Sequence, residues 1–444
     1  WGLNMALILP GNVASATAAA GYDVANSCRF EDGSSAYMAV ATSDAGTDQR
    51  RTWTFSTWFK IGNPGLESVI FCSTATPAAD HLYIRLKSDG TMRFLDFVSG
   101  NQCNLVTTRK FRDVGAWYHL VIRADTTQST ASDRLRIYIN GGDQETFGTE
   151  DTYDEDQVTN TGLASGEYFI GVNQVETGAF WDGYLAETYF CSGQSYAPTQ
   201  FGEFNEDSPT IWQPIDASGS TFGTNGFYLD YEASDNLGND ANGGTDFTET
   251  NLAATDQATD TPTNNFCTVN PLDDFYQDAG FTEGNCKLTF KGTQSLYAYS
   301  TGTFGVSGGK WYWENKATSA GNHDNYGIVG RLADATSTLI GRNTDNYGYY
   351  NYNGKYSNAA TDGTYREVDF SGGNVTWTTN DIIGIALDME NDTVSFYKNN
   401  ALTGTIDIIA PSTGFYYPAW NQVDGDAEVV EVNFGNPSYS LTSA

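Results

Sequence analysis

The carboxylates of this chain are not spaced as a glycosidase requires. Hydrolysis of a glycosidic bond needs two carboxylates that flank the bond from one strand face. The nearest group, Asp154-Glu155-Asp156, lies in a polar turn segment, and Glu187 stands alone on its strand, with Asp182 just before the Gly183 turn. We interpret Glu187 as a structural residue of a sandwich, predict no catalytic residue, and expect that the chain is not an enzyme.

The histidines and cysteines favour neither a catalytic triad nor a zinc site. The chain has only three histidines and six cysteines. His119 lies inside the apolar strand WYHLVI, which favours a packed residue over a base, while His81 and His323 lie in loops beside aspartates. No Cys-x-x-Cys pair occurs. We expect buried free thiols, with a Cys72–Cys103 bridge as the alternative, and neither metal nor cofactor.

One tyrosine-rich stretch, residues 343–355, has the chemistry that holds neutral sugars. Aromatic faces stack on the C–H surfaces of a sugar, while amides bond its hydroxyls. The alternative is a half-buried strand and hairpin in which alternate tyrosines belong to the core. The candidate ligand-binding tyrosines, interleaved with asparagines, are Tyr347, Tyr349, Tyr350 and Tyr352.

The elements that would position these side chains are short strands. Residues 51–60 alternate in strand fashion, and in residues 134–142 Leu135, Ile137 and Ile139 share one face before an Asn140-Gly141 turn. Residues 381–400 predict a complete hairpin with Ile383, Ile385 and Leu387 facing Val394 and Phe396. Together with 47 glycines and 27 tyrosines, these patterns predict an all-β chain.

The stretch from residue 233 to 265 has almost no large apolar residue, which predicts a linker. Its aspartates at 235, 240 and 246 suggest calcium, but Leu237 breaks the EF-hand pattern, so a plain Asx and glycine loop is preferred. The expected organisation is a small-residue-rich docking segment at 1–25, a jelly roll at 26–232, a linker at 233–270 and a second sandwich at 271–444.

The formal net charge of −33 would repel phosphate backbones, so we expect no nucleic-acid partner. Solubility explains such a charge, and an acidic face for cations is the alternative. No apolar run reaches the roughly 18 residues of a membrane span, so no membrane insertion is expected. The first residues lack a basic region, and Pro10 interrupts their apolar piece, so we expect no signal peptide.

Residues 51–202 resemble the laminin-G-like, concanavalin A-type jelly rolls through TWTFSTWFK, WYHLVI, LRIYINGG and WDGYLAETYF. Residues 309–435 resemble a SPRY domain, the B30.2-type sandwich, through GKWYWE, DIIGIALDMENDTVSFYKNN, Tyr417-Pro418 and NFG. Since partners bind the loop face of SPRY domains, this resemblance adds Tyr326, Trp377 and Trp420 as candidate ligand-binding residues. Trp377 is equally consistent with the core, and the family pattern places Trp311 and Trp313 in the core.

The pairing of the two modules, with the opening NSCRF and DGSSAY, is similar to structural proteins of tailed phages, particularly marine ones. This resemblance implies a protein of the virion surface, made in the host cytoplasm and serving as a fibre, tail or capsid decoration. Its implied partners are other virion proteins and host-surface glycans, with a homotrimer by analogy. The alternatives are a purely structural decoration protein without a host ligand and a glycan-degrading enzyme of the jelly-roll type.

Overall fold

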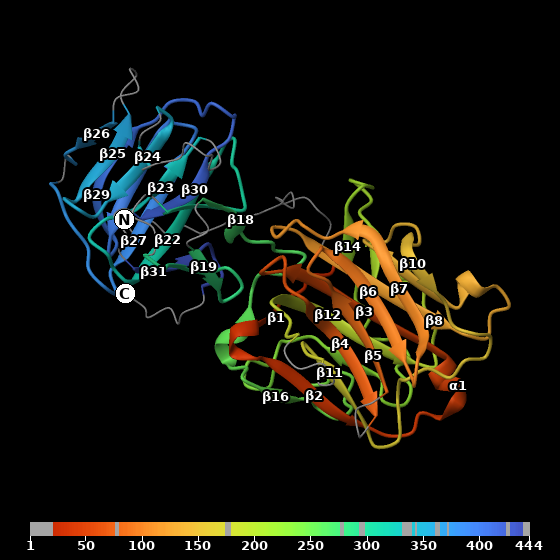
Figure 1. Cartoon of the computed structure of the whole chain (residues 1–444). Helices are drawn as coiled ribbons and strands as arrows, with labels where there is room; N and C mark the ends of the chain where they lie inside the picture. The colour runs from red at the N-terminus through yellow and green to blue at the C-terminus, as the bar shows by residue number, and fades with distance from the viewer. Residues whose placement is uncertain are drawn as a thin grey trace. The chain divides into compact units, whose positions relative to one another are not determined.

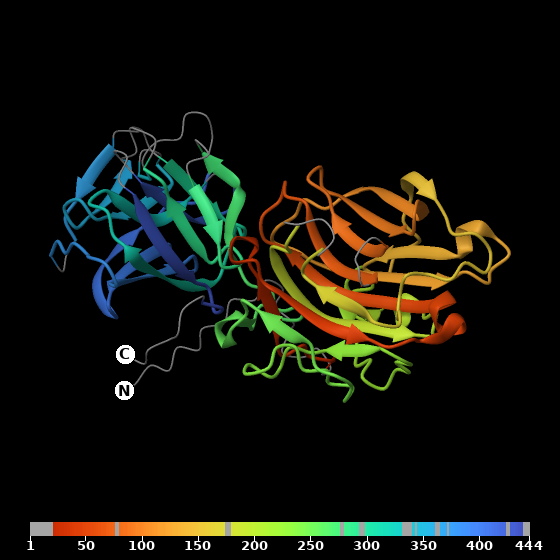
Figure 2. The ribbon, with the colours of Figure 1, turned by 60° about the horizontal axis from the view of Figure 1, so that its bottom comes forward.

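The computed structural model describes residues 21–75, 80–173, 179–275, 279–292, 298–330, 340–341, 344–359, 365–370, 373–422 and 427–437. Residues 1–20 of the predicted docking segment therefore lie outside the described residues. The described residues divide into one compact unit that ends at Asn265, the N-terminal domain, and a second that begins at Phe266, the C-terminal domain. Figures 1 and 2 show layers of strands with little helix in each domain, which confirms the all-β prediction.

The N-terminal domain is a sandwich of antiparallel sheets. One sheet has the order β17 (Gln257–Ala258), β1 (Ser27–Phe30), β12 (Gly183–Ser192), β3 (Thr52–Ile61), β8 (Trp117–Asp125) and β9 (Leu135–Ile139), and β15 (Phe227–Leu229) also pairs with β12. The other has the order β10 (Phe147–Asp151), β7 (Asn101–Lys110), β6 (Thr91–Phe97), β5 (His81–Leu86), β4 (Ser68–Ala75), β11 (Gly166–Ile170), β2 (Tyr37–Thr42) and β16 (Thr248–Thr250). A separate pair is formed by β13 (Gly202–Phe204) and β14 (Trp212–Pro214).

Helices in the described residues are short and connect strands. They are α1 (Gly46–Arg51) and the 3₁₀ turns η1 (Asp32–Ser34), η2 (Ala131–Asp133), η3 (Pro198–Gln200) and η4 (Ala254–Asp256). None of the helices within the described ranges is long and apolar enough to cross a membrane.

The C-terminal domain pairs two further antiparallel sheets. The first has the order β18 (Val269–Phe275), β21 (Ala298–Gly302), β30 (Tyr417–Gln422), β23 (Asp324–Val329), β24 (Asn346–Tyr350), β25 (Lys355–Ala359) and β26 (Tyr365–Val368). The second has the order β19 (Ala279–Thr282), β20 (Lys287–Phe290), β31 (Glu428–Asn433), β22 (Lys310–Ser319), β27 (Ile382–Asp388), β28 (Thr393–Lys398) and β29 (Ala401–Asp407).

The patterned strands form as predicted. Leu135, Ile137 and Ile139 are buried in the core of the N-terminal domain, and Asn140 and Gly141 adopt the positive φ of 51° and 64° that a tight hairpin turn needs. In the hairpin of β27 and β28, Ile385 lies opposite Phe396 and Leu387 opposite Val394, all inside the C-terminal core. The six cysteines are buried free thiols, so the alternative Cys72–Cys103 bridge is absent.

The predicted linker is wrong, because residues 233–265 are part of the N-terminal domain. β16 extends the sheet beside β2, and β17 pairs with β1. Leu237 and Phe247, two of the three large apolar residues of the stretch, are buried in the core, and the third, Leu252, packs against it. Asp240 and Asp246 accept hydrogen bonds from backbone N–H groups, as a plain Asx loop does.

Candidate functional site

Six of the seven aromatic residues predicted to bind a ligand are buried in the C-terminal domain, at 5% exposure or less: Tyr326, Tyr347, Tyr349, Tyr350, Trp377 and Trp420. A side chain enclosed on all sides offers no ring face to a ligand, so the prediction is wrong for these six. The alternative interpretation of the tyrosine stretch as core applies to them.

The buried aromatics have partners inside the domain that explain their positions. Tyr326 on β23 lies opposite Trp420 on β30, and the Tyr326 hydroxyl donates a hydrogen bond to Glu428. The Trp420 indole N–H donates to the Asn315 side chain at 2.7 Å. The Trp377 ring packs edge-on against Tyr349 with 4.7 Å between ring centroids. These aromatics link the two sheets of the C-terminal domain. Trp313 is buried with them as predicted, whereas Trp311 is only partly buried.

Tyr352 is the exception, with 60% of its surface exposed. It lies in the turn between β24 and β25, where its ring stacks on His323 with 4.8 Å between centroids and 15° between planes. Tyr350 borders the pair at 6.0 Å from the Tyr352 ring. The exposed ring face is able to contact a ligand, but one stacked pair on a turn encloses no volume.

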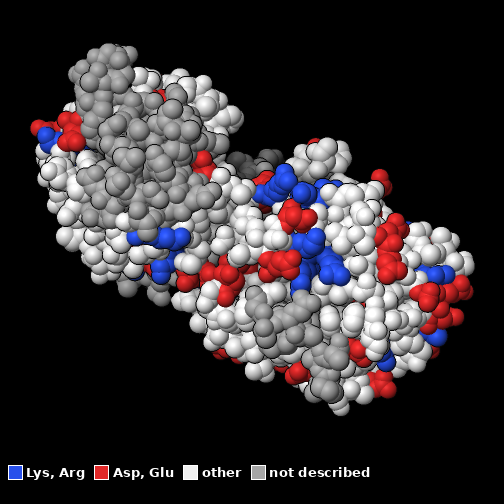
Figure 3. Space-filling view, in the orientation of Figure 1, with Lys and Arg blue, Asp and Glu red and all other residues white. Residues whose placement is uncertain are grey.

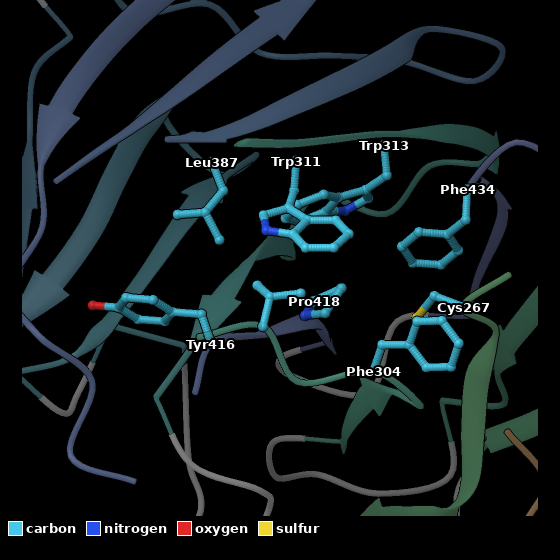
Figure 4. Close-up of a pocket in the computed structure, with 9 residues that line it drawn as sticks. Cys267, Phe304, Trp311, Trp313, Leu387, Tyr416, Pro418 and Phe434 are labelled. Carbon is cyan, nitrogen blue, oxygen red and sulfur yellow. The ribbon is translucent and has the colours of Figure 1, made fainter. Parts of the chain in front are cut away.

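An apolar pocket lies between the sheets of the C-terminal domain. Figure 4 shows the rings of Trp311, Trp313, Tyr416 and Phe434 around it. Its free space is about 20 Å³, which is room for about one water molecule. The remaining residues that line it are Cys267, Phe304, Val306, Leu387 and Pro418. A lining with so few polar groups and so little space does not fit a sugar.

A polar pocket in the N-terminal domain has about 230 Å³ of free space and is the best candidate for ligand binding. Its walls combine hydroxyl, amide and carboxylate groups with the rings of Tyr168 and Phe227, and the described residues that line it include neither lysine nor arginine. They are Val40, Ala41, Thr42, Tyr168, Gly223, Asn225, Gly226, Phe227, Asp240, Asn242, Gly244, Thr245 and Phe247.

The walls of this polar pocket are fixed by hydrogen bonds of two loops. Asn225, with a φ of 62°, donates its side-chain amide to the carbonyl of Ser43, and its amide oxygen accepts from the Ser43 backbone. The Asp240 carboxylate accepts from the N–H groups of Tyr228 and Asn242 at 2.9 and 3.1 Å. A Cβ on Gly244 would lie 2.2 Å from Asp240 Oδ2, so a larger residue there would displace the Asp240 carboxylate. The pocket is therefore held in shape without a ligand.

Sequence reasoning missed this pocket because five of its thirteen lining residues lie between residues 240 and 247, inside the stretch interpreted as a linker. The signal was the density of Asp, Asn and Gly, which marks both linkers and tight hydrogen-bonded loops. Asn242 and Thr245 are exposed at the pocket, so their side chains are available to a ligand.

His119 is a packed residue, as predicted. Its ring lies between Trp58 and Trp212, and burial lowers its pKa to about 3. Because Nδ1 accepts the indole N–H of Trp212 at 2.9 Å, the ring proton must be on Nε2, which faces the Ser56 hydroxyl at 2.9 Å. That tautomer donates to Ser56 and cannot take its proton.

Glu187 lies on β12, and its side chain is buried at 4% exposure. Its carboxyl group accepts hydrogen bonds from the hydroxyls of Tyr22, Tyr189 and Tyr228, and burial raises its pKa to about 7. This environment fits the structural interpretation of Glu187, because the side chain is enclosed by tyrosines rather than directed into a cleft.

Comparison with known families agrees with this architecture. Residues 32–193 match the family of the concanavalin A-like lectin/glucanases superfamily in its laminin G form, and residues 310–437 match the SPRY domain. The chain therefore contains a concanavalin A-like domain followed by a SPRY domain. No curated protein gives a significant match to the chain.

Solved structures that are similar to parts of the chain have low sequence identity to it. The SPRY domain of human HERC1 is 18% identical, with a TM-score of 0.29 over 37% of this chain and 96% of that one. A heptameric SAP-like pentraxin from Limulus polyphemus is 16% identical, with a TM-score of 0.29 over 40% and 81%. A Bacteroides ovatus protein assigned to carbohydrate binding is 13% identical, with a TM-score of 0.35 over 52% and 59%.

Proposed function

We propose that the chain is a non-enzymatic, lectin-like surface protein of a bacterial virus particle, and that its N-terminal domain binds a neutral glycan of the host surface. The observation that carries the binding proposal is the polar pocket of about 230 Å³. The placement on a virion is supported by the resemblance of the module pairing to tailed-phage structural proteins.

The lining of the polar pocket favours a neutral sugar over an anionic one. Sugar hydroxyls both donate and accept, and Asp240, Asn242 and Thr245 together offer both kinds of partner. The aromatic rings of Tyr168 and Phe227 give the pocket an apolar wall. With a carboxylate in the wall and no cationic group among the described lining residues, a sulfated or carboxylated glycan would be repelled.

The proposal is tested with fluorescent recombinant protein on bacterial cells, before and after removal of surface polysaccharide, and on an array of neutral bacterial glycans. We expect binding that disappears on stripping and that falls at least tenfold in Asn242→Ala and Thr245→Ala, because each removes about 1.4 kcal/mol or more of hydrogen bonding. Thr248→Ala is the matched control, because Thr248 is exposed on the neighbouring strand β16 outside the pocket.

Failure of the wild-type protein to bind any cell or glycan would overturn the lectin proposal and favour the alternative, a decoration protein held in the particle by protein contacts. Binding that survives in both pocket variants would place the glycan elsewhere. Tyr352→Ala then tests the exposed Tyr352 ring, which stacks on His323, in the same assay.

A further inference from the structure

A tight turn brings Asp260 and Asn265 together at the end of the N-terminal domain. Thr261 and Asn264 form an antiparallel bridge, with backbone hydrogen bonds of 3.3 and 3.0 Å in the two directions. Asp260 and Asn265 flank this bridge, and residues directly opposite each other in an antiparallel pair project to the same side. Both side chains reach Lys60 on β3. The Lys60 Nζ atom lies 2.7 Å from Asp260 Oδ2 and 2.8 Å from Asn265 Oδ1.

The Lys60 amine is shielded from water by its neighbours on the sheet. Lys60 and Asp260 are 1% and 0% exposed. Lys60 lies opposite Trp117 on β8 and opposite Tyr184 on β12, and both rings belong to an apolar cluster on this face of the sheet. Burial disfavours the charged forms of lysine and aspartate alike. Transfer of one proton from the ammonium to the carboxylate therefore leaves two neutral groups, of which the free amine is a nucleophile.

The Asn265 amide presents its carbonyl group to that amine. Its Nδ2 atom donates a hydrogen bond to the Gly115 carbonyl at 2.7 Å, so Oδ1 is the atom that faces Lys60. A C=O bond is about 1.2 Å long, which puts Nζ within about 4 Å of the amide carbon Cγ. Reacting atoms attack from about 3–3.5 Å, so a small shift of the side chains suffices. The indole N–H of Trp117 donates to Asp260 Oδ1 at 2.8 Å and holds the carboxylate beside the amine.

We propose that Lys60 and Asn265 form an amide cross-link within the chain, with Asp260 as the acid–base residue. Asp260 takes one proton from the Lys60 ammonium, and the freed amine attacks Cγ to form the new C–N bond. Asp260 then gives its proton to Nδ2 and takes a second one from the attacking nitrogen. The bond between Cγ and Nδ2 breaks, and ammonia leaves with the proton that Asp260 holds. In net terms an ammonium and a primary amide become a secondary amide and a free ammonium ion, so no oxidant or co-reactant is needed.

The surroundings assign the roles of electrophile and acid–base residue. An ionised carboxylate is a poor target for a nucleophile, whereas the amide carbon carries no charge, so Asn265 is the group attacked. Asn265 is half-buried, which gives the released ammonium ion a way to solvent. The new bond joins β3 to the last residue of the N-terminal domain, and all six cysteines are free thiols, so no disulfide makes such a link. The ion pair of Lys60 and Asp260 belongs to the freshly folded chain, and the cross-link forms from it.

The test is intact mass spectrometry of the denatured full chain, after purification and after incubation at neutral pH, together with a peptide map. We expect the mass to fall below that of the sequence by one ammonia molecule, and the map to contain one branched peptide that joins Lys60 to Asn265. A succinimide at an Asn-Gly pair loses the same ammonia, but it joins no two peptides. Asp260→Asn and Asn265→Ala should keep the full mass and lack the branched peptide. Asn264→Ala, at the exposed neighbouring residue, should still form the cross-link.

Should Asp260→Asn fail to fold, Asn265→Ala decides the question, because Asn265 is half-buried on a turn and its truncation leaves the buried pair of Lys60 and Asp260 in place. A wild-type chain that keeps its full mass after incubation would overturn the proposal. So would a branched peptide that persists in Asn265→Ala, or a loss of water in place of ammonia with Lys60 joined to Asp260. None of these outcomes depends on whether the polar pocket binds a glycan.

Discussion

The ion pair between Lys60 and Asp260 gives a sharp test of whether residues 233–265 belong to the N-terminal domain. Lys60 Nζ lies 2.7 Å from Asp260 Oδ2, and the two side chains are 1% and 0% exposed. The indole N–H of Trp117 donates to the other Asp260 oxygen at 2.8 Å, and Lys60 also donates to the Asn265 side chain at 2.8 Å. Every charged group of the pair thus has a buried partner.

We expect Asp260→Asn to destabilise the N-terminal domain by about 3–5 kcal/mol. The amide keeps the size of the side chain but removes the negative charge, so the Lys60 ammonium is left buried with only neutral partners, and breaking a buried pair in this way costs about that much. For a domain of about 250 residues, 1 kcal/mol shifts the melting midpoint by roughly 2–4 °C. The midpoint should therefore fall by about 6–20 °C.

The assays are urea unfolding, which gives the free energy of unfolding, and thermal unfolding, which gives the midpoint, both on the full chain and followed by tryptophan fluorescence. Asp156→Asn is the control, because Asp156 forms an exposed pair with Arg51 at 3.8 Å that should contribute less than about 1 kcal/mol. Adding Lys60→Met to Asp260→Asn should recover part of the loss, since no buried charge then remains. A loss below about 1 kcal/mol in Asp260→Asn, equal to the control, would refute the packing of this segment.

Three further predictions concern single side chains. The pKa of Glu187 is raised to about 7 from 4.5, so the folded state holds this proton more tightly than the unfolded state does. The stability that the bound proton contributes is complete below pH 4.5 and is lost as the pH rises through 7. Between pH 4.5 and pH 8, urea unfolding should show that the wild type loses about 3 kcal/mol more stability than Glu187→Gln loses. Gly141→Ala should cost about 1–3 kcal/mol in thermal unfolding, because its Cβ would lie 2.1 Å from the Trp212 ring at a φ of 64°. Trp420→Phe should cost about 1–3 kcal/mol, because Asn315 loses its buried donor; an unchanged midpoint would contradict this.

The strand framework was predictable because its signals are local. Alternating apolar residues such as Leu135, Ile137 and Ile139 form a strand face whatever that face packs against, and Asn140-Gly141 determines the turn by its own backbone preference. Free cysteines followed from their small number and irregular spacing. The same signals did not show which strand faces remain exposed to solvent. β24 is buried along its whole length, so alternation alone could not show that Tyr347, Tyr349 and Tyr350 are all enclosed.

The segment from 233 to 265 shows why composition misjudges such regions. A stretch with few apolar residues is expected to stay unfolded, because it buries too little surface to offset the entropy of ordering. Here Leu237 and Phe247 supply that surface by joining a core formed elsewhere, and Asp240 replaces lost water contacts with backbone N–H groups. The criterion fails because it treats the stretch as if it folded alone.

The net charge of the chain does not show which carboxylates lie close together, whereas the fold does. A net charge of −33 averages over the whole chain, and Figure 3 shows acidic side chains distributed over both domains beside a local group of lysines and arginines on the N-terminal domain. Most exposed carboxylates are solvated and gain little from a bound ion. Glu31, Asp32 and Asp182 differ because strand pairing places them together and burial withdraws solvent from one of them. It is this combination of register and burial, which no count of aspartates contains, that raises the pKa of Asp182 well above its ordinary value.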